Sequence, residues 1–354
     1  MQQSMIRFVL LLSIVITTGC TAPPFEERID ALLTPYQSPQ PGLAMRLVRG
    51  EQVVIERTIG LAELDSMQTV GATTNFRLAS ITKHLTALAI LVLIEDGRLT
   101  LDTRLNEILP QFPEYAKRIS IQHLLQHQSG LPDYEPLVPL DRQPRIRDQG
   151  VVNLLLEVSV LDFEPGTSYH YSNSGYAVLA VIVETITGQA FETFLQERIF
   201  NPSKMSQSVA FVQGQNEVLN RALGYTMREA EIIETDQSDY SAVLGDGGVY
   251  SSIADLTTWH RAGFGRTLIS DQLFTTMMTP ALERYGYGWR IDQFEGQTRY
   301  HHSGSTSGFR NFIAHFPDLD LTLILLTNRA GPDVLPIGEE ILRLYLERES
   351  ISAK

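Results

Sequence analysis

Segments typical of β-strands lie near both ends of this chain, with helical segments between them. Near the N-terminus, residues 43–48 and 53–57 flank Gly50 and predict a β-hairpin. Near the C-terminus, strands joined by tight turns are expected over 285–291, 297–301, 309–316 and 321–327. Runs of strands at both ends of a helical middle predict an α+β fold.

The expected architecture is an antiparallel sheet flanked by N- and C-terminal helices, with a large all-helical region inserted into it. The sheet region comprises residues 41–97 and 241–350, and the insertion comprises residues 98–240. Apolar residues at helical spacing predict helices over 25–33, 80–95, 177–187, 190–199 and 335–346.

Charge and motif content exclude several classes of function. The chain has 354 residues and a net charge of −13. Phosphate binding needs a basic surface, so this charge argues against a nucleic-acid partner. The sequence has no phosphate-binding loop and no dinucleotide fingerprint. We therefore expect no cofactor, and we expect no metal site.

The N-terminal segment has the pattern of an export signal. Residues 8–16 are apolar apart from Ser13, and Gly19 precedes Cys20, the only cysteine in the chain. This pattern resembles the lipobox of bacterial lipoproteins. Residues 1–19 are then a signal peptide, and residues 20–40 are a lipid-anchored linker with the start of the first helix. The alternative is an ordinary secretory signal with an isolated cysteine.

Ser80 and Lys83 form the first candidate for catalytic chemistry. They stand three residues apart at the start of a predicted helix, so they share a helix face. A serine is a weak nucleophile until a neighbouring base takes its proton, and a lysine can be that base when its charged form is disfavoured. The alternative is a capping serine with a solvated lysine. The other three lysines have no serine three residues before them: Lys117, Lys204 and Lys354.

Two further elements supply polar groups to such a site. Tyr171 and Asn173 follow about ninety residues later; a phenol can relay a proton and an amide can hold a substrate carbonyl. His302, Ser303, Gly304 and Ser305 end a predicted strand, where small residues let a substrate lie alongside the strand. Taken singly, each element reads equally well as a loop pair or a turn.

Together these elements, in this order and spacing, resemble the class C β-lactamase and D-Ala-D-Ala carboxypeptidase family of serine hydrolases, which also includes esterases and D-aminopeptidases. The resemblance extends over residues 40–345, and supporting stretches lie at 76–83, 123–131, 165–166, 247–252 and 287–289. It implies a β-lactamase/transpeptidase-like fold.

The resemblance also implies roles for the candidate residues. Ser80 is expected to be the nucleophile, Lys83 its general base and Tyr171 the proton relay. Asn173 is expected to bind the substrate amide, and His302 to line the strand side of the pocket. The backbone N–H groups of Ser80 and Ser305 are expected to form the oxyanion hole.

One departure from the family pattern bears on the substrate. The β-lactamases of the family usually have lysine where this chain has His302, and a histidine is mostly neutral at pH 7. The departure favours carboxypeptidase- or esterase-like activity with weak lactamase action, unless Arg310 supplies a replacement cation. A structural role for Arg310 fits better, as it does for His84, His123 and His127.

Several functions stay open on these grounds. The substrate is expected to be a small molecule or a peptidoglycan peptide, such as a D-Ala-D-Ala peptide or an ester. A class C-type β-lactamase is the alternative within the family, and a non-catalytic envelope lipoprotein that binds peptidoglycan or a partner protein is the alternative outside it. The resemblance to bacterial lipoproteins, with Thr21 after Cys20, implies a periplasmic protein anchored in the outer membrane.

Overall fold

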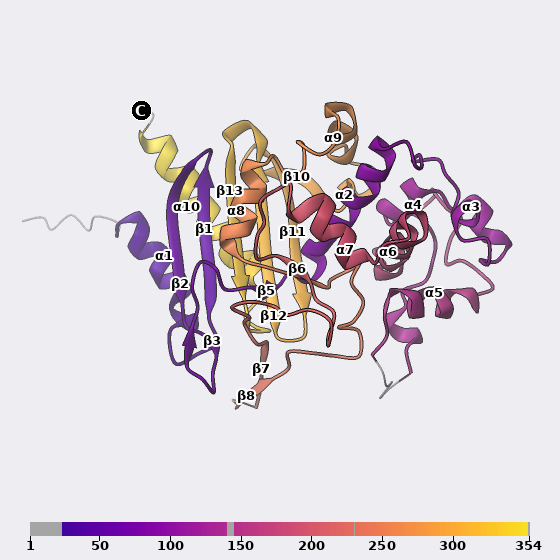
Figure 1. Cartoon of the computed structure of the whole chain (residues 1–354). Helices are drawn as coiled ribbons and strands as arrows, with labels where there is room; N and C mark the ends of the chain where they lie inside the picture. The colour runs from indigo at the N-terminus through magenta and orange to yellow at the C-terminus, as the bar shows by residue number, and fades with distance from the viewer. Residues whose placement is uncertain (1–22, 140–144, 230, 353–354) are drawn as a thin grey trace, which may run out of the picture.

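A six-stranded antiparallel sheet forms the framework of the protein (Figure 1). The computed structural model describes residues 23–139, 145–229 and 231–352. In spatial order the strands are β10 (Arg290–Phe294), β11 (Gln297–Thr306), β12 (Phe309–Phe316), β13 (Leu321–Thr327), β1 (Leu43–Arg49) and β2 (Gln52–Ile59). The N-terminal hairpin thus joins the C-terminal strands through β1 and β13, which pair in register from Leu43–Thr327 to Arg49–Leu321. The expected α+β fold is confirmed.

Helices cover both faces of this sheet. Strand β13 is buried along its whole length, and its side chains alternate between two apolar clusters. Leu323 and Leu325 pack against α1 (Phe25–Leu33) and α10 (Val334–Ser352). Ile324 and Leu326 belong to the second, larger cluster, which contains α2 (Thr82–Glu95) and α8 (Ile253–Arg261). Helix α2 therefore lies between the sheet and the helical region (Figure 1).

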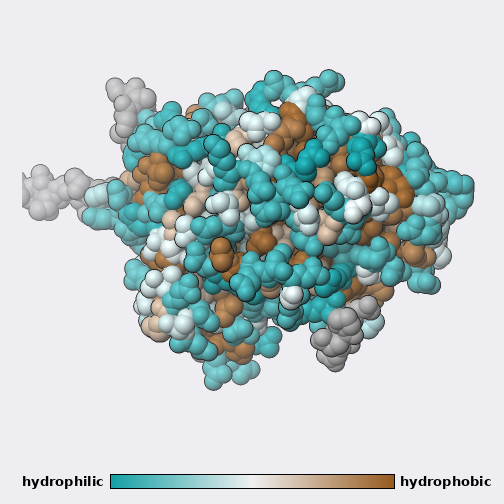
Figure 2. All heavy atoms as spheres, in the orientation of Figure 1, coloured by the Kyte–Doolittle hydropathy of each residue, from teal (hydrophilic) through white to brown (hydrophobic). Residues whose placement is uncertain are grey.

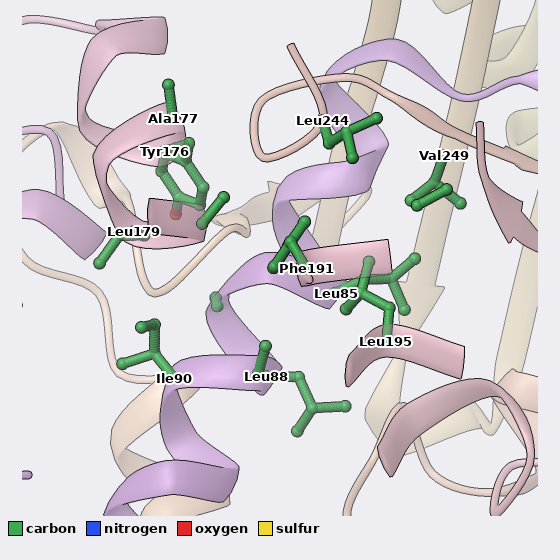
Figure 3. Close-up of a cluster of buried hydrophobic side chains, with 14 of the residues drawn as sticks. Leu85, Leu88, Ile90, Tyr176, Ala177, Leu179, Phe191, Leu195, Leu244 and Val249 are labelled. Carbon is green, nitrogen blue, oxygen red and sulfur yellow. The ribbon is translucent and has the colours of Figure 1, made fainter. Parts of the chain in front are cut away.

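The helical region packs around α2. Figure 3 shows Leu85 and Leu88 of α2 among apolar side chains from this region and from the segment that leads into β9. Its helices are α3 (Leu105–Ile108), α4 (Ile121–Leu125), α5 (Asp148–Leu156), α6 (Asn173–Thr187) and α7 (Phe191–Leu195), which continues into a π-helical turn (Gln196–Phe200); α9 (Asp271–Met277) follows α8.

Residues 98–240 were expected to be entirely helical, but short strands follow the π-helical turn. Strand β6 (Val209–Ala210) pairs with β9 (Val249–Ser251), which also pairs with β5 (Phe76–Arg77). The remaining short strands form two ribbons: β3 (Leu61–Glu63) with β4 (Gln68–Thr69), and β7 (Tyr225–Arg228) with β8 (Glu231–Glu234). Such brief pairings give too few alternating positions to be recognised in the sequence.

The strand expected over 285–291 is displaced in the structure, because β10 begins only at Arg290. Gly288 has a positive φ of 78°, a conformation that interrupts a strand. A Cβ atom at Gly288 would lie 2.6 Å from the carbonyl oxygen of Lys83, so the loop passes directly against α2. Residues that alternate like a strand are held here in a loop by tertiary contact.

Figure 2 shows one face of the molecule, on which hydrophilic side chains predominate and apolar ones occur in small groups. Among the described residues no single helix is long and apolar enough to cross a membrane. One pair, α6 with Phe191–Phe200, reaches that length and composition only together, with a bend of 83° between its halves. The predicted signal peptide and Cys20 lie outside the described residues.

Candidate active site

Ser80 and Lys83 face each other where a short 3₁₀ turn (Ala79–Ile81) runs into α2. The Lys83 Nζ atom lies 3.1 Å from the Ser80 Oγ atom. Lys83 is completely buried, whereas Ser80 is partly open to a cavity of about 260 Å³. Ala79, just before the serine, has a φ of +51°, a conformation unusual for a residue with a side chain. Such local strain is often found at active sites.

Two carbonyl oxygens complete the surroundings of the Lys83 amine. Its Nζ atom lies 2.8 Å from Oδ1 of Asn173 and 2.9 Å from the backbone oxygen of Asp246. A neutral amine has two N–H donors and one lone pair. If the two donors serve these carbonyl oxygens, the lone pair is directed at the Ser80 hydroxyl. The arrangement therefore suits a lysine that accepts the proton of the serine.

Tyr171 lies on the other side of the same amine. The Lys83 Nζ atom is 5.0 Å from the centre of the Tyr171 ring. The phenol oxygen is buried and has no hydrogen-bond partner among the described residues. His127 stacks on this ring at 4.3 Å, and its Nδ1 atom accepts the N–H of Ser172. His127 thus fixes the orientation of Tyr171, a structural role that its sequence context already favoured.

Strand β11 approaches Ser80 from the sheet side. A Cβ atom at Gly304 would lie 2.0 Å from the backbone oxygen of Leu78, so only glycine allows this approach. Ser305 then lies on the wall of the same cavity as Ser80. The two residues expected to form the oxyanion hole are thus brought to one cavity. Ser303 pairs with Phe312 of β12 within the sheet.

His302 lies behind this cavity, not on its wall. It is 2% exposed, and its Nε2 atom lies 3.2 Å from the hydroxyl of Tyr285. Its Nδ1 atom lies 2.7 Å from the backbone oxygen of Ser303. Burial and then nearby cations hold the pKa of His302 well below its usual value, so its ring is uncharged at neutral pH. In the core the ring of His302 also contacts that of His84, with the ring centres 5.7 Å apart, and His84 in turn stacks on Trp289.

Arg310 does not supply a cation to the cavity. Its guanidinium donates hydrogen bonds to the backbone oxygens of Thr306 and Phe309, and burial lowers its pKa. Arg310 is also absent from the residues that form the cavity wall. Its contacts are those of a residue that braces the turn between β11 and β12.

Carboxylates that the sequence did not single out surround the cavity. Glu135 accepts a hydrogen bond of 3.0 Å from Nδ2 of Asn173, and Asp246 accepts one of 2.8 Å from the hydroxyl of Tyr134. Burial raises the pKa of Glu135, and the negative charges of Asp133 and Asp246 raise it further. Two carboxylates, those of Glu135 and Asp246, thus share the cavity wall with the cationic residue Arg77. The sequence signals for these carboxylates were the acidic residues on either side of Tyr134 and Asp246, which precedes two glycines.

The histidines and carboxylates of the described residues are not arranged to bind a metal ion. His123 Nδ1 lies 3.4 Å from the backbone nitrogen of Ser120 and takes part in the N-terminal cap of α4. Within residues 23–139, 145–229 and 231–352, no group of three or more His, Cys, Asp or Glu side chains is placed to hold a metal ion.

Comparison with known proteins agrees with this geometry. The β-lactamase family model matches residues 25–346. The chain is 29% identical over 301 residues to penicillin-binding protein 4* of Bacillus subtilis, covering 79% of this chain and 66% of that protein. It is 28% identical over 324 residues to a D-aminopeptidase of Brucella canis, covering 87% and 60% respectively. It therefore spans less than two thirds of the length of either relative.

The fold is also found in solved structures. The octameric penicillin-binding protein homologue from Pyrococcus abyssi superposes with a TM-score of 0.80 at 24% identity, covering 91% of this chain and 77% of that one. The family match extends over nearly the whole described structure and includes both Ser80 and the strand that faces it. The chain belongs to the β-lactamase family of serine hydrolases.

Proposed function

We propose that this protein hydrolyses amides or esters through an acyl-enzyme formed on Ser80. The hydrogen bond between Lys83 and Ser80, in a buried site that opens on a cavity, is the observation that carries this proposal. Lys83 takes the proton of Ser80 as its oxygen bonds to the substrate carbonyl carbon. The tetrahedral oxyanion faces the backbone N–H groups of Ser80 and Ser305.

The second half of the reaction regenerates the serine. The C–N or C–O bond of the substrate breaks, and the leaving group takes a proton relayed by Tyr171. Water then adds to the acyl-enzyme, and its proton returns through the same groups as the acid leaves. A fluorophosphonate should therefore label the native protein once per chain. Failure to label would favour the alternative of a non-catalytic binding protein.

The substrate that best fits the cavity carries a positive charge close to its scissile carbonyl. Glu135 and Asp246 line the cavity, and Asp133 lies beside the start of α6, with its carboxylate 3.4 Å from the N–H of Asn173. A free α-ammonium group would relieve the mutual repulsion of these carboxylates. We therefore favour a D-aminoacyl amide or a peptide with an N-terminal D-residue, as the similarity to a D-aminopeptidase also suggests.

A D-Ala-D-Ala carboxypeptidase is the second candidate, and Arg77 is the observation in its favour. Arg77 borders the cavity, and its Nε and Nη1 atoms are buried without a hydrogen-bond partner among the described residues. The positive charge of Arg77 beside the cavity would attract a substrate carboxylate. D-Alanine p-nitroanilide, its N-acetylated form and an N-acylated D-Ala-D-Ala peptide separate the two candidates. An aminopeptidase requires the free amine of the first, whereas a carboxypeptidase cleaves only the last.

Glu135→Gln tests the proposed recognition of the amine. The substitution keeps an oxygen that can accept the hydrogen bond from Asn173 and removes the negative charge. We expect kcat/KM for D-alanine p-nitroanilide to fall about 10- to 100-fold, the usual worth of a hydrogen bond to a charged group. The N-acetylated compound, measured with the same variant, should change by less than about threefold.

The two substrates make the assay its own control. An equal loss on both compounds would mean that Glu135 acts only through Asn173, and the preference for an amine would have to be abandoned. A loss confined to the free amine would support the D-aminopeptidase assignment over the carboxypeptidase.

We also propose that Cys20 carries a lipid that anchors the protein to a bacterial envelope membrane, with the hydrolase in the periplasm. The apolar run before Gly19 and the cysteine that directly follows Gly19 support this. Cys20→Ser should move the full-length protein from the membrane fraction to the soluble periplasmic fraction of a Gram-negative host. Unchanged fractionation of the variant would exclude the anchor.

A further inference from the structure

Asp148 is a buried carboxylate that the reaction scheme does not use. It is the first residue of α5 and is 7% exposed. Its Oδ2 atom accepts the N–H of Leu244 at 2.8 Å, and its Oδ1 atom accepts the N–H of Gly245 at 2.9 Å. Both oxygens are therefore committed to two consecutive backbone amides of one segment, residues 244–246.

The same segment holds the amine of Lys83. The residue after Gly245 is Asp246, whose backbone oxygen lies 2.9 Å from the Lys83 Nζ atom. Thr86, one turn further along α2, donates its hydroxyl to the backbone oxygen of Gly245 at 2.7 Å. The side chain of Leu244 packs in the apolar cluster around α2 (Figure 3). The segment is thus fixed by α2 on one side and by Asp148 on the other.

The backbone of this segment has little room to shift toward the helices. A Cβ atom at Gly245 would lie 2.3 Å from the backbone oxygen of Tyr176 in α6. If the contacts to Asp148 were lost, the Asp246 oxygen would be free to move away from Lys83, in the direction of the cavity. The lone pair of the amine would then no longer be held toward Ser80.

We propose that the ionised carboxylate of Asp148 is a positioning group for the general base, because it fixes the backbone oxygen that orients the Lys83 amine. The proposal rests on the role of Lys83 in forming the acyl-enzyme. It assigns a function in acylation to a residue that contacts neither the nucleophile nor the substrate cavity.

The surroundings of Asp148 make this support sensitive to pH. Burial raises the pKa of Asp148 to about 7; the two backbone N–H groups oppose that shift, and the charges of Asp246 and Glu184 add to it. Arg145, Arg147 and Glu192 border the polar cavity of about 580 Å³ that Asp148 also lines. Above pH 7 the carboxylate accepts both amides, and below it one oxygen carries a proton and holds its amide less firmly.

Asp148→Asn tests the proposal, with the rate of fluorophosphonate labelling as the measurement. The amide keeps one acceptor and turns an N–H₂ group toward the second backbone donor. We expect labelling at pH 8.5 to slow about tenfold or more, and the ratio of wild-type to variant rates to shrink toward about one at pH 5.5.

Asp255→Asn is the matched control. Asp255 is another buried carboxylate whose Oδ2 atom accepts two consecutive backbone amides, those of Gln207 and Ser208, which are remote from residues 244–246 in sequence. It should lose thermal stability as Asp148→Asn does and label at a rate close to the wild type. Equal rates for the two variants at pH 8.5, or a wild-type to Asp148→Asn ratio that does not change with pH, would overturn the proposal.

Thr86→Val provides a second route if Asp148→Asn does not fold. It removes the hydroxyl that holds Gly245 and preserves the shape of the side chain, so labelling should slow in the same direction as for Asp148→Asn. Wild-type rates in Thr86→Val would overturn the role of the segment. If the native protein fails to label at all, the acyl-enzyme itself is refuted, which is a separate result.

Discussion

Ser80→Ala is expected to abolish covalent labelling by a fluorophosphonate and to lower kcat/KM on an amide or ester by roughly 10⁴-fold or more. The Ser80 oxygen, the proposed nucleophile, lies 3.1 Å from the Lys83 amine, within hydrogen-bonding distance. Removing it leaves the oxyanion donors and the cavity in place, so a small residual rate above that of water should persist. Intact mass spectrometry after labelling measures the first effect, and steady-state kinetics the second.

Ser307→Ala is the matched control. Ser307 also lines the cavity, but the hydrogen bonds of the Lys83 amine go to Ser80, Asn173 and Asp246. It should label at a rate within about threefold of the wild type. Ser80→Ala should unfold at nearly the wild-type temperature, because its hydroxyl is partly exposed and makes few contacts. Full labelling of Ser80→Ala would place the nucleophile elsewhere and refute the site.

The periodicity of apolar residues in the sequence correctly predicted those strands and helices whose buried side chains recur at regular spacing. The hairpin around Gly50, the last two strands and the helix over 25–33 lie where the sequence placed them. The strand expected over 285–291 failed because Gly286 lies against Met277 and Gly288 lies against Lys83 of α2, about two hundred residues earlier in the chain. Tertiary contacts of this kind leave no periodic signal in the sequence.

The contact between Ser80 and Lys83 could be predicted, but its surroundings could not. Ser80 and Lys83 share one helix face, so their spacing alone brings the hydroxyl to the amine. Glu135 and Asp246 reach the cavity from loops whose positions depend on the whole fold. A lone acidic residue in a loop reads as solvated surface, and only the folded chain shows that these carboxylates converge.

The family pattern predicted the course of β11 but not the direction in which the His302 side chain points. The pattern places a residue of β11 near the nucleophile, and the strand does pass there, with Gly304 against Leu78. Side chains alternate along a strand, however, and His302 packs with Tyr285 in the core while Ser305 reaches the cavity. No cationic side chain of this strand lines the cavity, and the charged residues that do are Glu135, Asp246 and Arg77. This is the physical basis for preferring a substrate that carries an ammonium group.

Lys83→Met is expected to lower the rate of fluorophosphonate labelling by about 10²- to 10⁴-fold, the usual contribution of a general base. Methionine has a similar length and no donor or acceptor that could replace the amine. The loss should therefore fall on acylation, while the Ser80 hydroxyl remains present and accessible. Lys117→Met is the control, because Lys117 is exposed, pairs only with Glu114 among the described residues, and should label at the wild-type rate.

Lys83→Ala separates the loss of the base from damage to the fold. The shortened side chain leaves a space lined by the Asn173 Oδ1 atom and the Asp246 backbone oxygen, the two acceptors that the lysine amine meets.

A small primary amine such as ethylamine can enter such a space, donate to both oxygens and present its lone pair to Ser80. Labelling of Lys83→Ala should rise with the concentration of ethylamine, and more steeply at high pH, where more of the added amine is neutral. Tetramethylammonium carries the charge of an ammonium ion but has no lone pair and no N–H donor, so it should have no effect. Equal recovery with both compounds, or labelling of Lys83→Met at the wild-type rate, would show that a group other than Lys83 takes the proton.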